Sequence, residues 1–181
     1  DTSAQVVVTP GNRHSATISY ANTLPTSITN AVVSITLSGS AIDYASIQTT
    51  SGFYRSADHT IVFSRDTDPA LALLAPGASG IGTFSFLTLP ADALTVSPTL
   101  TFTISVSGTR VGQTNVPETV SASATKTVKV ATAVTLSAAA LHSSGPFSNS
   151  GPIPPQANQA TTYSVVMAVR SGMNAVAGGT V

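Results

Sequence analysis

Asp66 and Asp68, in the segment RDTDP, are the residues of this chain best suited to hold a metal ion. Ca²⁺ prefers six to eight oxygen ligands, and two carboxylates with nearby carbonyls supply part of such a shell. Aspartate is equally common at turns, where its side chain bonds to the backbone. The sequence therefore offers Asp66 and Asp68 as a weak calcium candidate, and it predicts no other metal site and no cofactor.

A second kind of chemistry is offered by the stretch FYRS, in which Phe53, Tyr54 and Arg55 are adjacent. Aromatic rings and an arginine exposed together can contact a sugar or a protein partner. The other aromatic residues mostly alternate with polar ones, so we expect them in the core, and the chain has no Trp. Phe53, Tyr54 and Arg55 are thus the candidate ligand loop.

Catalytic constellations are not found in the sequence. His14, His59 and His142 are far apart, no G-x-S-x-G motif is present, and there is no cysteine. Asp58 precedes His59, but neighbours on a strand point to opposite faces, so this aspartate is poorly placed to orient the imidazole. We predict that the protein is not an enzyme and has no catalytic residues.

The charge of the chain excludes other functions. Charged residues make up 8% of its 181 residues, against roughly 25% in ordinary globular proteins. Seven acidic residues balance seven basic ones, so no field attracts nucleic acid. No apolar run reaches the roughly 20 residues that a membrane helix needs. Nucleic-acid binding and membrane insertion of this segment are therefore not expected.

The elements that must position these residues are strands. In LTFTISVS, Leu100, Phe102, Ile104 and Val106 fall on one face and hydroxyl residues on the other, which is typical of a half-buried antiparallel strand. The same alternation recurs along the chain and predicts an all-β protein. The expected core comprises Ile18, Val33, Ile35, Phe63, Phe84, Phe86, Phe102 and Ile104. Around Asp68, the sequence DPALALLAPG is compatible with a helical turn that has Asp68 as its N-cap, and equally with a loop that places Leu71 and Leu73 in the core.

A repeated phrase indicates how the strands are organised. Pro10, Pro76 and Pro155 are each followed, after six residues, by Thr, an apolar or aromatic residue, and Ser. The first and third copies are 145 residues apart, which indicates a tandem repeat. The middle copy is expected to begin a similar strand in the opposite half of the same β-sandwich. We predict a complete sandwich in residues 1–131 and the first strands of a second one in residues 132–181.

These blocks resemble the immunoglobulin-like conserved repeats of bacterial and archaeal cell-surface proteins. The matching residues are PGNRHSATISYANTLP, NAVVSITLSG, SGFYRSADHTIVFS and LAPGASGIGTFSF. The resemblance implies tandem immunoglobulin-like antiparallel β-sandwiches, the second one incomplete. It also implies a structural role, because such repeats usually serve as spacers, stalks or lattice parts.

The sequence therefore predicts an extracellular structural protein: a repeat module of a stalk, surface layer or filament at the cell surface. Its partners would be copies of itself or neighbouring surface proteins, and the alternative is an adhesin-type module that recognises sugar or protein. Strands after residue 131 carry an apolar face that must be covered. We expect the chain to continue beyond Val181 and cover it, the alternative being strand addition from another chain.

Overall fold

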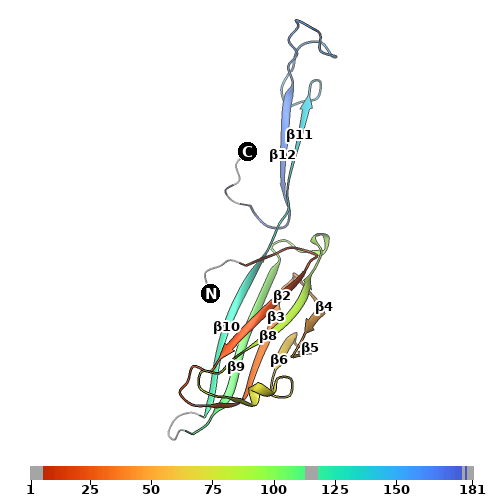
Figure 1. Ribbon diagram of the computed structural model, residues 1–181. Helices are drawn as coiled ribbons and strands as arrows, with labels where there is room; N and C mark the ends of the chain where they lie inside the picture. Colours follow the sequence, from red (N-terminus) through yellow and green to blue (C-terminus); the bar gives the residue numbers. More distant parts are fainter. Residues whose placement is uncertain (1–5, 113–117, 177, 179–181) are drawn as a thin grey trace. The chain divides into compact units, whose positions relative to one another are not determined.

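The computed structural model describes residues 6–112, 118–176 and 178 and separates into two compact units, residues 1–131 (unit 1) and 132–181 (unit 2). Figure 1 follows both units along the chain, coloured from red to blue. Apart from two short 3₁₀ turns, η1 (Pro69–Ala72) and η2 (Ala91–Ala93), the assigned elements are strands. No helix in the described part of the chain is long and apolar enough to cross a lipid bilayer.

Unit 1 is a β-sandwich. Its strands are β1 (Val7–Val8), β2 (Arg13–Ala21), β3 (Ile28–Ser38), β4 (Ile42–Thr49), β5 (Phe53–Arg55), β6 (Thr60–Phe63), β7 (Leu73–Leu74), β8 (Ser79–Thr88), β9 (Thr99–Arg110) and β10 (Thr119–Val130). The larger sheet has the order β1-β10-β9-β3-β6-β5, with β7 pairing the start of β3. The smaller sheet has the order β2-β8-β4. All pairings are antiparallel except that of β1 with β10.

The period-2 pattern of the sequence explains which side chains fill the space between the sheets. In β3, Ala31, Val33, Ile35 and Leu37 point inward and are almost completely buried, and Val32, Ser34 and Thr36 between them point outward. In β8, Phe84 and Phe86 point inward, and both rings meet Phe102 of β9 edge-on. Burial removes apolar surface from water and is the main stabilising contribution to the fold.

Two residues of the expected core lie elsewhere. Val33, Ile35, Phe63, Phe84, Phe86 and Phe102 are buried as predicted. Ile18 of β2 and Ile104 of β9 are only partly buried and pack at the margin of the core. Both point inward, as alternation requires, but they lie where the two sheets part at one side. The prediction that they belong to the buried core was therefore wrong.

The first two copies of the repeated phrase lie side by side in one sheet. The first copy contributes β2 and the middle copy β8, and these strands pair antiparallel with Thr17 opposite Thr83. The threonine of one phrase thus meets the threonine of the other, with Ala16 opposite Phe84. The expectation that the middle copy lies in the opposite half of the sandwich was wrong, because spacing along a sequence carries no information about strand pairing.

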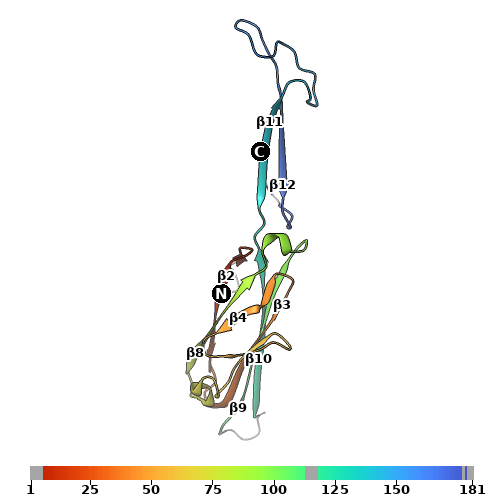
Figure 2. The same cartoon turned by 90° about the vertical axis from the view of Figure 1, so that its right-hand side faces the viewer.

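Unit 2 contains a two-stranded antiparallel pair, β11 (Val134–Leu141) and β12 (Ser164–Ser171), with a long loop between the strands (Figure 2). Leu136 lies opposite Val169 and Ala138 opposite Met167. These residues share one face, since every second residue of a strand points the same way. Within the described residues, no third strand pairs with this hairpin.

Candidate functional site

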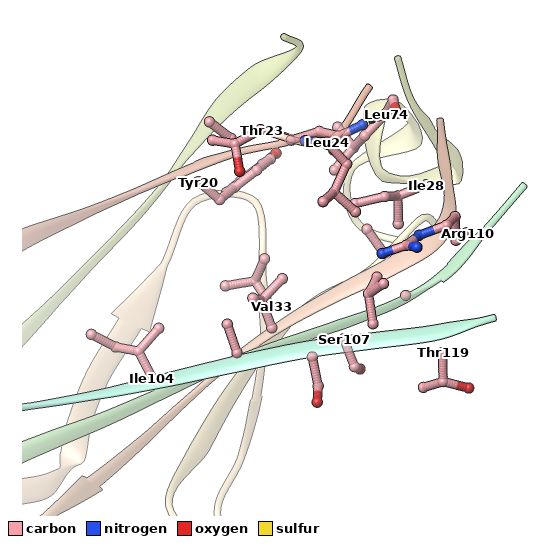
Figure 3. Close-up of a pocket in the computed structure, with 18 of the residues that line it drawn as sticks. Tyr20, Thr23, Leu24, Ile28, Val33, Leu74, Ile104, Ser107, Arg110 and Thr119 are labelled. Carbon is pink, nitrogen blue, oxygen red and sulfur yellow. Dashed lines mark hydrogen bonds between the residues drawn. The ribbon is translucent and has the colours of Figure 1, made fainter. Parts of the chain in front are cut away.

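A groove with a volume of about 630 Å³ lies at one side of the sandwich of unit 1. We call it the edge groove. Its lining comes from β2 and the segment after it, from β3, β7, β9 and β10: Ile18, Ser19, Tyr20, Ala21, Asn22, Thr23, Leu24, Ile28, Ala31, Val33, Leu74, Ile104, Val106, Ser107, Gly108, Arg110, Thr119, Val120, Ser121 and Ala122. Figure 3 shows Tyr20, Thr23 and Leu24 on one wall and Ile104, Ser107 and Thr119 on the other.

The edge groove exists because the two sheets end there without closing on each other. In the smaller sheet, β2 pairs with β8 along one edge, and no strand pairs with its other edge among the described residues. In the larger sheet, β10 pairs with β9, and its outer edge meets β1 only at Lys129 and Val130. Between Thr119 and Thr125, no described strand pairs with that outer edge. Two strand edges therefore border one apolar hollow.

The composition of β10 accounts for the open side. Its inward positions from residue 120 onward are Val120, Ala122, Ala124 and Lys126, followed by the buried Val128 and Val130. Small side chains in the first half of the strand do not reach the opposite sheet. Both lysines of the chain lie in the second half of β10. The stretch from Thr119 to Thr125 carries no charge, although exposed edges are commonly protected by lysine or proline.

One end of the edge groove is fixed by Asn22, which is 2% exposed. Its Nδ2 donates to the carbonyl oxygens of Thr26 (2.8 Å), Leu74 (2.9 Å) and Ala75 (3.2 Å). Its Oδ1 accepts a hydrogen bond from the backbone N–H of Leu24 at 3.0 Å. The side chain thereby joins the segment after β2 to the end of β7 and holds the groove wall in place.

The lining of the edge groove is mainly apolar. Its floor contains the buried Ala31 and Val33, and its walls contain the partly buried Ile104 and Val106. Among the described residues that line it, only Arg110 is charged. With no carboxylate, imidazole or thiol in its lining, the groove offers neither an acid–base pair nor a nucleophile activated by a base.

Asp68, half of the weak calcium candidate, already has structural partners. Its Oδ1 accepts from the backbone N–H of Ala70 at 3.1 Å, so it is the N-cap of η1, which is the helical-turn alternative that the sequence allowed. Its Oδ2 accepts a hydrogen bond from the Tyr20 hydroxyl at 2.9 Å. Burial, and then this bond, raise the pKa of Tyr20 to about 12. Asp66 is exposed beside Arg65, with 3.9 Å between carboxylate and guanidinium.

The candidate ligand loop is strand β5 at the edge of the larger sheet. Phe53 is 62% exposed. The Tyr54 hydroxyl lies 3.1 Å from His59 Nδ1, and the His59 ring stacks on Tyr44 with 3.8 Å between centroids. Burial is the main cause that raises the pKa of Tyr54. The structure thus separates the three predicted residues: Phe53 faces solvent, whereas Tyr54 is held against His59.

Arg55 forms an ion pair with Asp58 at the β5–β6 turn. Its Nε donates to Oδ1 at 2.8 Å and its Nη2 to Oδ2 at 2.5 Å. These hydrogen bonds lower the pKa of Asp58 and raise that of Arg55. Because both groups are exposed, the pair shapes the turn and contributes little to stability.

The three histidines lie in separate places. His14 Nε2 is 3.0 Å from the Thr9 carbonyl, His59 lies between Tyr44 and Tyr54, and His142 meets the Tyr163 ring in unit 2. Among the described residues, no three His, Cys, Asp or Glu side chains gather where they could share a metal ion.

The sequence did not suggest the edge groove as a site, and it did not single out Asn22, which fixes one end of the groove. A signal is present in TVSASATKTVKV, where the inward positions of a strand change from Val and Ala to Lys and back to Val. Small residues at inward positions indicate a strand whose inner face meets no opposite layer. Nothing in the sequence shows that β2 lies across from this stretch, because that pairing depends on the tertiary fold.

Comparisons with known proteins place the chain in no family. No family model matches it, and no curated protein matches it. Solved structures similar to it include AvmM, which catalyses macrocyclization in alchivemycin A biosynthesis, at 10% identity and a TM-score of 0.40, over 70% of this chain and 84% of that chain. They also include PapD-like domain 7 of human CEP192, at 14% identity and a TM-score of 0.32, over 71% and 82%. The seventh ScaB type I cohesin of Pseudobacteroides cellulosolvens follows at 12% identity and a TM-score of 0.38, over 70% and 88%.

Proposed function

We propose that this protein is a structural module of an extracellular cell surface, in a stalk, surface layer or filament. In this proposal, unit 1 is a complete immunoglobulin-like sandwich and unit 2 is the first part of a second one. The module acts by associating with copies of itself or with neighbouring surface proteins, and it is not an enzyme.

The observation that carries the proposal is the edge groove. It combines an apolar lining with two strand edges that have no strand partner in the described residues. Such edges bind additional strands through backbone hydrogen bonds, with side-chain pockets that select the incoming residues. A groove of this kind is suited to assembly.

The outer face of the larger sheet supports the same function. Hydroxyl residues of β10, β9 and β3 lie opposite one another in rows, such as Thr125–Thr103–Thr36 and Ser123–Ser105–Ser34. Ser34 Oγ and Ser105 Oγ are 2.7 Å apart, and Thr36 Oγ1 and Thr60 Oγ1 are 2.9 Å apart. The hydroxyl rows themselves carry no charge, and Lys129 of β10 and Arg55 of β5 are the charged residues that share their face. A face with so few charges repels a second copy only weakly.

The test is sedimentation velocity of the chain over a wide range of concentration, at low and high salt. We expect association that grows with concentration and changes little with salt, because the contacts are apolar and backbone-mediated. A chain that stays monomeric at the highest concentration, together with the lack of any filament or lattice in its native source, would contradict the proposal.

A second candidate function is adhesion, which the exposure of Phe53 on the edge strand β5 favours. Phe53 lies beside Arg55, so an aromatic ring and a guanidinium face the same solvent region. A glycan array and a protein-binding screen test this alternative. We expect any ligand found there to be lost with Phe53→Ala and retained with Phe147→Ala, which removes an equally exposed ring from unit 2.

A further inference from the structure

The open edge of β10 presents a defined set of backbone groups. The backbone N–H of Lys129 donates to the carbonyl oxygen of Val6 at 3.1 Å, so this group points away from β9. The backbone groups of successive residues alternate between the two edges of a strand. Because β10 pairs with β9 from Thr119 to Lys129 without a register shift, this alternation holds along the whole strand. The N–H and C=O groups at the open edge therefore belong to four residues: Thr119, Ser121, Ser123 and Thr125.

The inner face beside this edge has space for the side chains of an added strand. The inward positions of β10 along it are Val120, Ala122 and Ala124, and both alanines are exposed. Ile18 and Tyr20 of β2 line the opposite wall. A strand that pairs with β10 directs every second side chain into the hollow between these walls. Large apolar side chains at those positions leave water and cover the exposed alanines.

Arg110 places a positive charge at one end of the edge groove. It ends β9 as a half-buried residue of the inner face, and its backbone N–H donates to the carbonyl oxygen of Glu118, the residue before β10. Figure 3 shows Arg110 beside Ile28, at the same end of the groove as Thr119. Guanidinium groups bind carboxylates in a fork geometry, and such charge-assisted hydrogen bonds are stronger than neutral ones. The groove therefore favours a segment that carries an acidic side chain at this end.

We propose that the open edge of β10 binds an extended segment of another surface protein by strand addition, an inference that rests on the proposed assembly function. The segment has about seven residues and a length of roughly 24 Å, with apolar side chains at alternate positions and an acidic residue at the Thr119 end. The short strand β1 already pairs with the other end of this edge, at Lys129 and Val130. The added strand thus takes the remaining length of an edge that already accepts one strand.

The charge requirement favours a different protein over a second copy of this chain. All seven acidic residues lie in residues 1–118, and residues 119–181 contain none. The described acidic residues belong to the strands and turns of unit 1, such as Asp43 in β4 and Asp68 at the N-cap of η1. A second copy would have to unfold part of its own sandwich to present one of them on an extended strand. A separate protein supplies the acidic strand without that loss of stability.

Synthetic peptides test which partner this edge selects. Two fluorescein-labelled peptides of about seven residues alternate Val and Thr and carry Asp at the first or the last position, so that both strand directions are covered. Control peptides have the same composition with the valines grouped together, or Lys in place of Asp. Fluorescence anisotropy with the full chain should show one alternating Asp peptide binding about tenfold more tightly than either control. Arg110→Gln should remove the preference for Asp over Lys.

Proline variants locate the edge. Ser123→Pro removes an N–H group that points away from β9, so the pairing with β9 is kept while the added strand loses a partner. Ser19→Pro removes the corresponding group at the open edge of β2 and is the matched control. We expect Ser123→Pro to weaken peptide binding about tenfold and Ser19→Pro to leave it unchanged. In the native chain, the bound peptide should also slow hydrogen exchange at Ser121 and Ser123 but not at Ser19.

The inference is wrong if the control peptides bind equally well, or if Ser19→Pro and not Ser123→Pro abolishes binding. Slow hydrogen exchange at Ser121 and Ser123 before any peptide is added would also overturn it, because another part of the chain would then occupy the edge. If no peptide binds but the chain associates in sedimentation, the assembly function stands and this partner is wrong. If the chain also stays monomeric at every concentration, the proposed function fails as well.

Discussion

At the scale of single residues, Asn22 and Tyr20 organise the end of unit 1 that borders the edge groove. Asn22 is buried, and its side-chain amide forms four hydrogen bonds, all of them with backbone groups. The Tyr20 hydroxyl bonds to Asp68, and Gly80 opposite it leaves space for the ring, since a Cβ there would collide with the ring. These hydrogen bonds fix β2 and the segment after it to the η1–β7 region, and so they hold one wall of the edge groove in place.

Removing the Asn22 amide is expected to destabilise unit 1 strongly. Asn22→Ala leaves buried carbonyl groups without donors, which costs about 3 kcal/mol. Asn22→Asp keeps the shape but turns a carboxylate toward carbonyl oxygens, and it should cost at least as much. Urea denaturation measures both variants, with Asn12→Ala, an exposed asparagine, as the control. If Asn22→Ala changed the free energy of unfolding by less than about 0.5 kcal/mol, which is the usual range for surface substitutions, the Asn22 hydrogen bonds would not stabilise the fold.

Tyr20 predicts how stability responds to alkaline pH. Its pKa in the folded protein is about 12, above the ordinary value of 10.0. The stability that neutral Tyr20 contributes is therefore fully present below pH 10 and is lost as the pH rises toward 12. We expect Tyr20→Phe to lower stability at neutral pH by about 1.5 kcal/mol, through the lost hydrogen bond to a carboxylate.

The same variant should show a flatter decline of stability between pH 10 and pH 12, because one titrating group has been removed. Chemical denaturation at a series of pH values measures this slope. Tyr163→Phe, in unit 2, serves as the control for unit 1. If the free energy of unfolding of Tyr20→Phe fell with pH as steeply as that of the native chain, groups other than Tyr20 would cause the alkaline loss of stability.

At the scale of elements, glycine residues of β8 leave room for large aromatic rings that pack against this strand. A Cβ at Gly82 would lie 2.7 Å from Cζ of Phe63, which belongs to the opposite sheet and is 2% exposed. Gly82 therefore lets the tip of the Phe63 ring approach the β8 backbone closely. Glycine usually weakens a strand. At position 82 its missing side chain allows the two sheets to pack closely, because a Cβ would collide with Phe63.

Adding a methyl group at this position is expected to destabilise unit 1. Gly82→Ala forces the Phe63 ring to move and should cost about 1–3 kcal/mol, as overpacking of a core does. Phe63→Leu creates space of its own, so the double variant should be less unstable than the sum of the two single ones. A thermal or urea double-mutant cycle measures this coupling. Simple additivity would mean that the two residues do not compete for space.

At the scale of the whole molecule, the buried apolar core belongs to one unit. Every residue of the core cluster lies between Val8 and Val130, and it includes residues from both sheets. Unit 2 has a hairpin whose large apolar residues are exposed. A two-stranded hairpin is at best marginally stable in water. The two units therefore differ in what they need: unit 1 has its own core, and unit 2 needs a covering layer.

This difference predicts how fragments behave. A chain of residues 1–131 should fold by itself and unfold cooperatively, with a urea midpoint close to that of the main transition of the full chain. A peptide of residues 132–181 alone should show little protection from hydrogen exchange. Circular dichroism and exchange measurements check the two fragments. An unfolded 1–131 fragment would show that unit 1 depends on residues after 131.

The alternation of apolar and hydroxyl residues by itself indicated the strands and their inward-facing residues, and the Asp-Pro pair at Asp68 allowed the N-cap that the structure shows. These depend on contacts that are local in sequence, so a period of two and a capping residue are enough to predict them. For this reason Val33, Ile35 and Phe102 were correctly predicted as buried. The function proposed here also begins from sequence, since the near absence of charge favours association.

Only the tertiary structure decided which strands are neighbours. It paired β2 with β8, placed Ile18 and Ile104 at an open margin, and set the edges of β2 and β10 across from each other. It also brought Asn22 to the carbonyls of Leu74 and Ala75, about fifty residues away. Strand pairing joins residues that are distant in the chain, and any strand with the right alternation can in principle join several partners. The edge groove depends on this strand pairing, because it forms where the two sheets end at β2 and β10 without meeting.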